Sequence, residues 1–171
     1  MPESQRLTSR RNMSARYSKS KKRSGGSALS PSPPEQFVIY LDENLCNSNA
    51  ILDVLGRLEI PHERHLEHFA RGVPDDQWLP LVGKNGWVLL TADKRIRYNL
   101  LEKRALEQHS VREFVFASGN LSGPEMAAAL ELALERMRNT CRKALPPFVA
   151  SITRKGEIHL RWQKSHGTKR E

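Results

Sequence analysis

Apolar residues along the chain fall into short continuous runs, and these runs alternate with stretches that favour helix. Runs at residues 37–41, 87–90 and 112–118 are rich in β-branched and aromatic side chains, which predicts buried strands. Residues 47–58, 98–109 and 122–145 indicate helices, through apolar spacing or helix-forming composition. Strands that alternate with helices predict an α/β fold with a mainly parallel central sheet.

Local signals set the ends of several elements. Ser122 and Glu125 form a capping-box pattern at the start of the last helix. A short helix within residues 70–86 should end near Gly83 or Gly86. Pro61 ends the first helix, and we expect a short polar strand around residues 62–66. Residues 148–162 alternate between apolar and polar around a Lys-Gly turn, which predicts a C-terminal β-hairpin.

Basic charge is concentrated at the start of the chain. Residues 1–34 hold eight Lys or Arg, one acid and nine Ser, and they supply +7 of the net charge of +9. Such a segment buries too little apolar surface to offset its ordering entropy. We therefore expect a disordered basic tail at 1–35, one folded domain at 36–163 and a basic tail at 164–171. A mitochondrial transit peptide is an alternative for the first segment, because it is rich in Arg and Ser and poor in acids.

Other compositional features favour an ordinary intracellular protein. No apolar run reaches the length of a membrane span, and no signal-peptide core is present. We therefore expect a cytoplasmic location and no membrane partner. Cys46 and Cys141 are the only cysteines, and two isolated cysteines are typical of buried reduced thiols.

Acidic residues stand at element boundaries rather than on exposed helix faces. They are Asp42, Glu43, Asp75, Asp76 and Asp93. Ligands of parallel sheets bind at the carboxyl ends of strands, and Asp42 and Asp93 both directly follow predicted strands. If those strands are neighbours, the two carboxylates lie roughly 5–10 Å apart. A hard divalent cation such as Mg²⁺ would stabilise such a cluster and could activate water near a phosphate.

Simpler roles are open for the same residues. Asp42, Asp75 and Asp93 could each cap the helix that follows, because Asp is a common N-cap residue. Thr91 could order the Asp93 loop through its hydroxyl, or it could simply end a strand.

Cations follow Asp93 directly, at Lys94, Arg95 and Arg97. Arg can hold a phosphate through two hydrogen bonds, and the macrodipole disfavours cations at a helix start. The alternative is an ordinary solvated helix start.

Histidines and tryptophans carry weaker signals. His62, His65 and His68 repeat every three residues, which does not converge on a metal when they lie along a strand. We expect a polar surface role for all three. Trp78 and Trp87 are expected in the core.

Three segments together resemble PIN-like domains related to VapC-type toxins. They are FVIYLDENL, VPDDQWLPLVGKNGWVLLTADKRIRYNLLEKRAL and FVFASGNLSGPEM, and the likeness runs from about Phe37 to Ile152. The order and spacing of the LDEN, D-x-x-W and T-x-D-K boxes carry it. The resemblance implies a Rossmann-like three-layer α/β/α fold and an Mg²⁺- or Mn²⁺-dependent ribonuclease, often the toxin of a toxin–antitoxin pair.

By this resemblance, Asp42, Asp75 and Asp93 match the acidic catalytic and metal-binding positions, with Asp76 as an alternative to Asp75. Many relatives carry a further acid two residues after the Asp93 position, where this chain has Arg95. Glu43 or Glu102 would replace that acid.

The expected function is therefore an endoribonuclease in which water activated by Mg²⁺ or Mn²⁺ attacks an RNA phosphodiester. Thr91, Lys94, Arg95 and Arg97 would hold the phosphate. RNA is the expected partner, and a cognate antitoxin and a homodimer are compatible with the resemblance. The first alternative is a catalytically impaired relative that binds nucleic acid or protein. A phosphoacceptor receiver domain is disfavoured, because Thr91, Asp93 and Lys94 crowd onto one turn.

Overall fold

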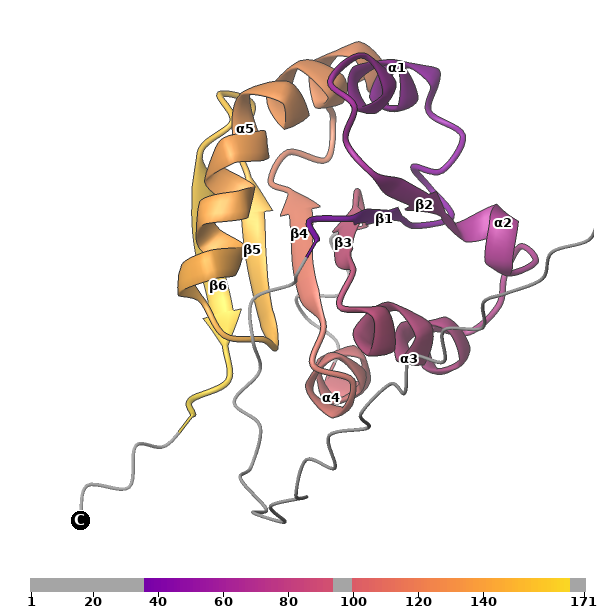
Figure 1. Cartoon of the computed structure of the whole chain (residues 1–171), viewed down its shortest axis with the longest axis vertical. Helices are drawn as coiled ribbons and strands as arrows, with labels where there is room; N and C mark the ends of the chain where they lie inside the picture. The colour runs from indigo at the N-terminus through magenta and orange to yellow at the C-terminus, as the bar shows by residue number, and fades with distance from the viewer. Residues whose placement is uncertain (1–35, 94–99, 167–171) are drawn as a thin grey trace, which may run out of the picture.

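A six-stranded sheet organises the chain, in the order β2-β1-β3-β4-β5-β6 (Figure 1). The computed structural model describes residues 36–93 and 100–166. Its strands are β1 (Ile39–Leu41), β2 (His62–Arg64), β3 (Val88–Thr91), β4 (Arg112–Phe116), β5 (Phe148–Ile152) and β6 (Ile158–Gln163). The first five pair in parallel and β6 is antiparallel to β5. The mainly parallel sheet and the C-terminal hairpin are thus confirmed.

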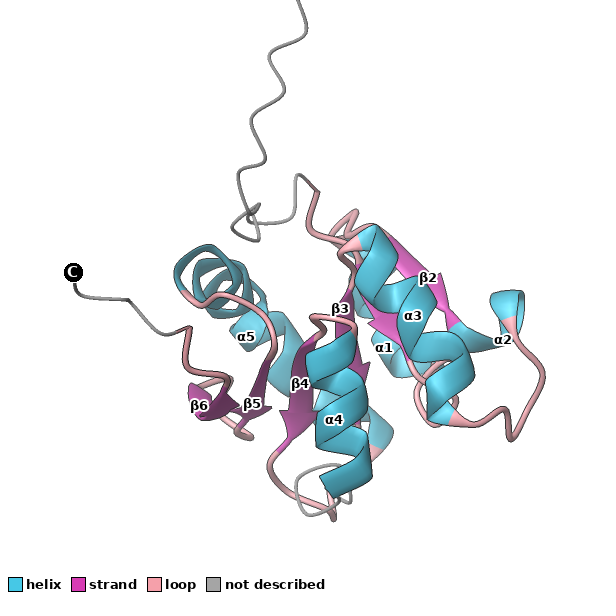
Figure 2. Ribbon diagram, turned by 90° about the horizontal axis from the view of Figure 1, so that it is seen from below, coloured by secondary structure: helices cyan, strands magenta, loops and turns pink. Residues whose placement is uncertain are grey.

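Helices cover both faces of this sheet, which makes three layers. The helices α1 (Asn49–Arg57) and α5 (Gly123–Lys143) pack together on one face. On the other face lie α3 (Asp75–Asn85) and α4 (Leu100–Gln108), which are in front of the sheet in Figure 2. The short helix α2 (His65–His68) follows the edge strand β2 directly. This arrangement is the predicted α/β/α fold.

Side chains of β1 show why its strand reads as a continuous apolar run. Ile39 and Leu41 join the core beneath α1 and α5, whereas Tyr40 joins the core beneath α3 and α4. Successive side chains of a strand point to opposite faces, so a strand covered on both faces is apolar throughout. The Tyr40 ring stacks on Trp78 and Trp87, with centroid distances of 5.6 and 5.8 Å.

Several local predictions are confirmed. Ser122 accepts a hydrogen bond from the Glu125 N–H, and the Glu125 side chain accepts one from the Ser122 N–H, which completes the capping box. Trp78 is buried, and both cysteines are buried and reduced. Gly86 ends α3 in the left-handed conformation, with φ 66°, which a glycine adopts without strain.

Some predicted features lie outside the described residues. These are the tail at 1–35, the last five residues of the predicted C-terminal tail, and the cations Lys94, Arg95 and Arg97. The sheet itself continues to Gln163. Among the described helices, none has both the length and the apolar character needed to cross a bilayer.

Gly83 allows α3 to approach the end of α4 closely. A Cβ placed there would lie 2.0 Å from the backbone oxygen of His109, whereas one at Gly56 in α1 would meet nothing within 4 Å. We expect Gly83→Ala to lower the free energy of unfolding by about 1–3 kcal/mol through overpacking. Gly56→Ala should raise it by up to ~1 kcal/mol through helix propensity. Urea unfolding measures both, and equal effects would contradict the close contact at Gly83.

Candidate active site

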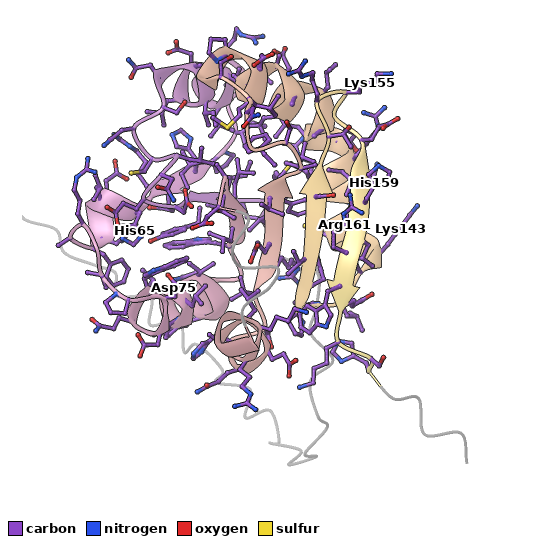
Figure 3. The ribbon with its side chains drawn as sticks, turned by 180° about the vertical axis from the view of Figure 1, so that it is seen from behind. His65, Asp75, Lys143, Lys155, His159 and Arg161 are labelled. Atoms are coloured by element: carbon purple, nitrogen blue, oxygen red, sulfur yellow. The ribbon has the colours of Figure 1, made fainter. Side chains whose placement is uncertain are left out.

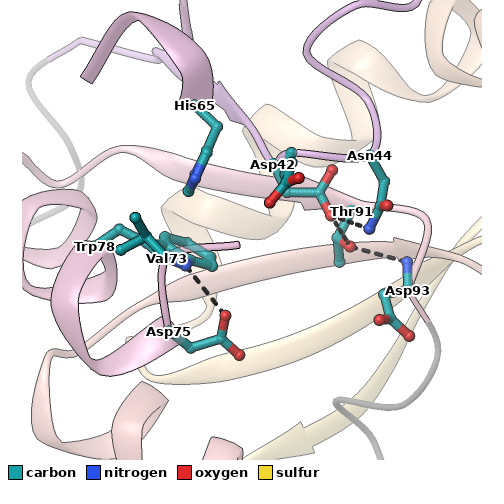
Figure 4. A pocket seen from close by; sticks show the side chains of 9 residues that line it. Asp42, Asn44, His65, Val73, Asp75, Trp78, Thr91 and Asp93 are labelled. Carbon is teal, nitrogen blue, oxygen red and sulfur yellow. Dashed lines mark hydrogen bonds between the residues drawn. The ribbon is translucent and has the colours of Figure 1, made fainter. Parts of the chain in front are cut away.

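The parallel pairing of β1 with β3 brings two strand ends together. Leu41 lies opposite Leu90, and the Asp42 N–H donates to the Leu90 carbonyl at 3.3 Å. Asp42 and Asp93 therefore emerge at the same edge of the sheet, and the start of α3 brings Asp75 to it. A cavity of about 120 Å³ results (Figure 4). Its lining residues are Asp42, Glu43, Asn44, His65, Val73, Asp75, Trp78, Thr91 and Asp93.

Asp42 is the most buried carboxylate of the cavity, with 7% of its surface exposed. Its Oδ1 accepts from the Leu45 N–H at 3.0 Å, and its Oδ2 accepts from Thr91 Oγ1 at 2.5 Å. Burial raises the pKa of Asp42, although these hydrogen bonds act in the opposite direction. Asp42 thus caps the turn that follows β1 and also lines the cavity. The next helix, α1, has Ser48 as its N-cap, so the expected helix-capping role of Asp42 is wrong.

Thr91 connects the two strand ends through its hydroxyl. It donates to Asp42 and accepts from the Asp93 N–H at 2.9 Å, which confirms that it orders the Asp93 loop. The residue is fully buried. Thr91 also lines the cavity, and the phosphate contact expected of it stays a prediction. Its role is to position the two carboxylates.

Asp75 lines the cavity from the first turn of α3. Pro74 is the N-cap of that helix, so the expected capping role of Asp75 is wrong. Its Oδ1 instead accepts from Trp78 Nε1 at 3.1 Å. Burial raises the pKa of Asp75, and the nearby Asp93 carboxylate adds to the rise. Asp76 is exposed and does not line the cavity.

Glu43 closes one side of the cavity and is tied to a loop. Its Oε2 accepts from the Gly72 N–H at 2.8 Å, and its Oε1 lies 3.9 Å from Arg71 Nη1. The backbone of Glu102 is helical, but its side chain is outside the described residues, as are the predicted phosphate contacts Lys94, Arg95 and Arg97.

His65 also lines the cavity, and the sequence interpretation missed it. It is only 1% exposed, so the predicted surface role is wrong. Its Nδ1 lies 2.9 Å from the Tyr40 hydroxyl, and its buried Nε2 has no hydrogen-bond partner among the described residues. The strand that was expected to run to Leu66 ends at Arg64. Because Arg64 pairs with Leu41, His65 stands at the strand end in the position that Asp42 takes on β1, and that equivalence is the signal that could have found it.

The donor chemistry of the cavity suits a hard divalent cation. Carboxylate oxygens are the ligands that Mg²⁺ and Mn²⁺ prefer. Within residues 36–93 and 100–166, no three His, Cys, Asp or Glu side chains converge closely enough to hold one ion between them. Mg²⁺ keeps several waters and commonly takes one or two carboxylates. The residues therefore fit such an ion, with water completing its ligand shell.

The fold and its cavity define an α/β protein with carboxylates gathered where its parallel strands end. Residues 37–118 match the family model described as PIN like domain. No curated protein and no solved structure gave a significant match. This match confirms the PIN-like resemblance over residues 37–118, and domains of this kind are commonly nucleases.

Burial of Asp42 makes a prediction about stability. Its pKa is raised in the folded state, so the carboxyl ionises first in the unfolded chain as pH rises, and the contribution of Asp42 to stability falls from about pH 4 upward. With metal chelated, the stability of Asp42→Asn relative to wild type should rise between pH 4 and pH 7. Chemical unfolding at several pH values measures this.

Asp53→Asn, at an exposed position of α1, is the control and should show a much smaller pH trend. A relative stability of Asp42→Asn that falls over the same range would contradict the electrostatic argument.

Proposed function

We propose that the protein is a metal-dependent endoribonuclease that hydrolyses RNA phosphodiester bonds. One observation carries the proposal: Asp42, Asp75 and Asp93 come from three different elements and line the same cavity. The PIN-like family match supports a nuclease of some kind. Hydrolysis forms a bond between a water oxygen and phosphorus, breaks one P–O ester bond and releases an alcohol.

Asp42, Asp75 and Asp93 are the residues that would hold Mg²⁺ or Mn²⁺, with Glu43 beside them. When bound, the cation would neutralise phosphate charge and lower the pKa of a water molecule. The chain supplies the positioning. The Thr91 hydroxyl fixes the position of the Asp42 side chain relative to the Asp93 backbone. The Trp78 indole N–H donates to one Asp75 oxygen, which leaves the other oxygen for a cation.

Substrate and partner assignments extend the proposal further. Lys94, Arg95 and Arg97 follow Asp93 in the sequence and would form a phosphate-binding rim, by their charge. A role as the toxin of a toxin–antitoxin pair, with a cognate antitoxin as partner, rests on the sequence resemblance alone.

A catalytically impaired module that binds nucleic acid or protein is the second candidate function. Two observations favour it. Arg95 stands where many relatives have another acid, and no three ligating side chains converge on one point among the described residues. Binding of RNA without cleavage would favour this candidate.

Neighbouring aspartates provide a matched test of activity. Asp75→Asn should reduce Mn²⁺-dependent cleavage of an RNA oligonucleotide more than about a hundredfold. Mutation of residues that only hydrogen-bond a metal ligand already lowers activity by up to about that factor. Asp76→Asn should cleave like wild type, because Asp76 is exposed and outside the cavity. Gel analysis of cleavage products measures both. Equal activity of the two variants would refute the proposed site.

Divalent cations should stabilise the folded protein through the same carboxylates. At a concentration of one hundred times its Kd, Mn²⁺ should add about 2.7 kcal/mol to the free energy of unfolding. Asp42→Asn and Asp93→Asn should lose most of this gain. Thermal unfolding with and without Mn²⁺ is the measurement, and an unchanged gain in both variants would show that the ion binds elsewhere.

A further inference from the structure

His65 is the buried polar group that the carboxylate scheme leaves unexplained. Its ring lies in the cavity wall, on the same side of the molecule as Asp75 (Figures 3 and 4). Polar atoms buried in native proteins nearly always have a partner, yet Nε2 of His65 has none among the described residues. An unpartnered atom that belongs to a cavity-lining side chain indicates a ligand rather than a packing role.

The hydrogen bond between Tyr40 and His65 determines whether Nε2 of His65 carries a proton or a lone pair. A tyrosine hydroxyl carries its proton at neutral pH and can donate or accept. The only hydrogen bond of that hydroxyl among the described residues is the one to His65 Nδ1, at 2.9 Å. If Tyr40 donates to Nδ1, neutral His65 carries its proton on Nε2, and one donor remains unpartnered. If Nδ1 donated instead, the Tyr40 proton and the Nε2 lone pair would both be orphaned.

The second arrangement is disfavoured, because each additional buried orphan costs about 1–3 kcal/mol. His65 therefore presents an N–H to the cavity. An N–H cannot coordinate a metal, which needs the lone pair of the nitrogen. It can donate to an oxygen that carries negative charge.

We propose that Nε2–H of His65 donates a hydrogen bond to a non-bridging oxygen of the phosphate that enters this cavity, and that Tyr40 is the positioning residue that holds this tautomer. The inference rests on the proposed function, since it names a residue that would recognise the scissile phosphodiester. Carboxylates bind the cation and repel the phosphate, so the cavity needs at least one donor that is not an anion. His65 is the buried side chain of the lining that supplies it.

The surroundings of Tyr40 make its hydroxyl a precise probe. The ring is held in stacks with Trp78 and Trp87, and Tyr40→Phe keeps the ring while it removes the hydroxyl. In this variant Nδ1 loses its donor, and the two tautomers of His65 become closer in energy.

Nitrogen-15 NMR of the imidazoles tests the tautomer directly. In wild-type protein, Nε2 of His65 should carry a proton while Nδ1 accepts from Tyr40, and Tyr40→Phe should shift the tautomer toward a mixture. With Mg²⁺ present, inorganic phosphate should move the Nε2 resonance. A wild-type proton on Nδ1, or no response to phosphate, would overturn the inference.

Variants separate a phosphate donor from a metal ligand. His65→Leu should weaken phosphate binding about ten- to a hundredfold, as expected for a hydrogen bond to a charged group, and leave the Mg²⁺ affinity unchanged in calorimetry. His65→Gln, which keeps an N–H donor, should restore part of the phosphate affinity. His68→Leu is the matched control, because His68 bonds Glu63 at 2.8 Å outside the cavity lining.

The outcomes also separate this inference from the proposed function. Mg²⁺ affinity that falls in His65→Leu would make His65 a metal ligand and overturn the donor role. RNA cleavage and phosphate binding that are unchanged in His65→Leu would overturn the inference alone. A wild-type protein that binds phosphate through His65 but neither binds Mg²⁺ nor cleaves RNA would refute the proposed function and keep the inference.

Discussion

The parallel pairing of β1 with β3 is the constraint on which the site depends. Leu41 and Leu90 are paired in register, so the segments that follow β1 and β3 leave the sheet side by side, at the carboxyl ends of the strands. Thr91 then uses one hydroxyl to join Asp42 to the backbone of Asp93. A slip of one residue would turn each side chain to the other face of the sheet, and the carboxylates would enter the core beneath α1 and α5.

Electrostatics of the cavity work against the folded state in the absence of a cation. Burial raises the pKa values of both Asp42 and Asp75, which means that their ionised forms are disfavoured where they stand. Hydrogen bonds from Thr91, Leu45 and Trp78 offset only part of this cost. Strain of this kind is typical of functional sites, where charges are kept because a ligand compensates them.

Predictions succeeded where short-range physics decides. The apolar runs revealed β1, β3 and β4, the capping box revealed the start of α5, and the acids after β1 and β3 led to the cavity. The predictions failed where the exact end of a strand decides the environment of the next residue. Because β2 ends at Arg64 rather than near Leu66, His65 begins a helical turn beneath Tyr40 instead of pointing to solvent. Thr91 was understood in part, since its hydroxyl orders the Asp93 loop as expected, whereas its hydrogen bond to Asp42 was not foreseen.

The amino-acid sequence by itself determined the fold class and the acids at the strand ends, because hydrophobic periodicity and element boundaries are local properties of the chain. It also carried the PIN-like motifs that the family match bears out. Only the tertiary structure decided which aspartate of the Asp75–Asp76 pair faces the cavity, and that His65 is buried beside it. Those outcomes depend on how α2 and α3 pack against Tyr40, and contacts between segments so far apart in the chain leave no periodic signal.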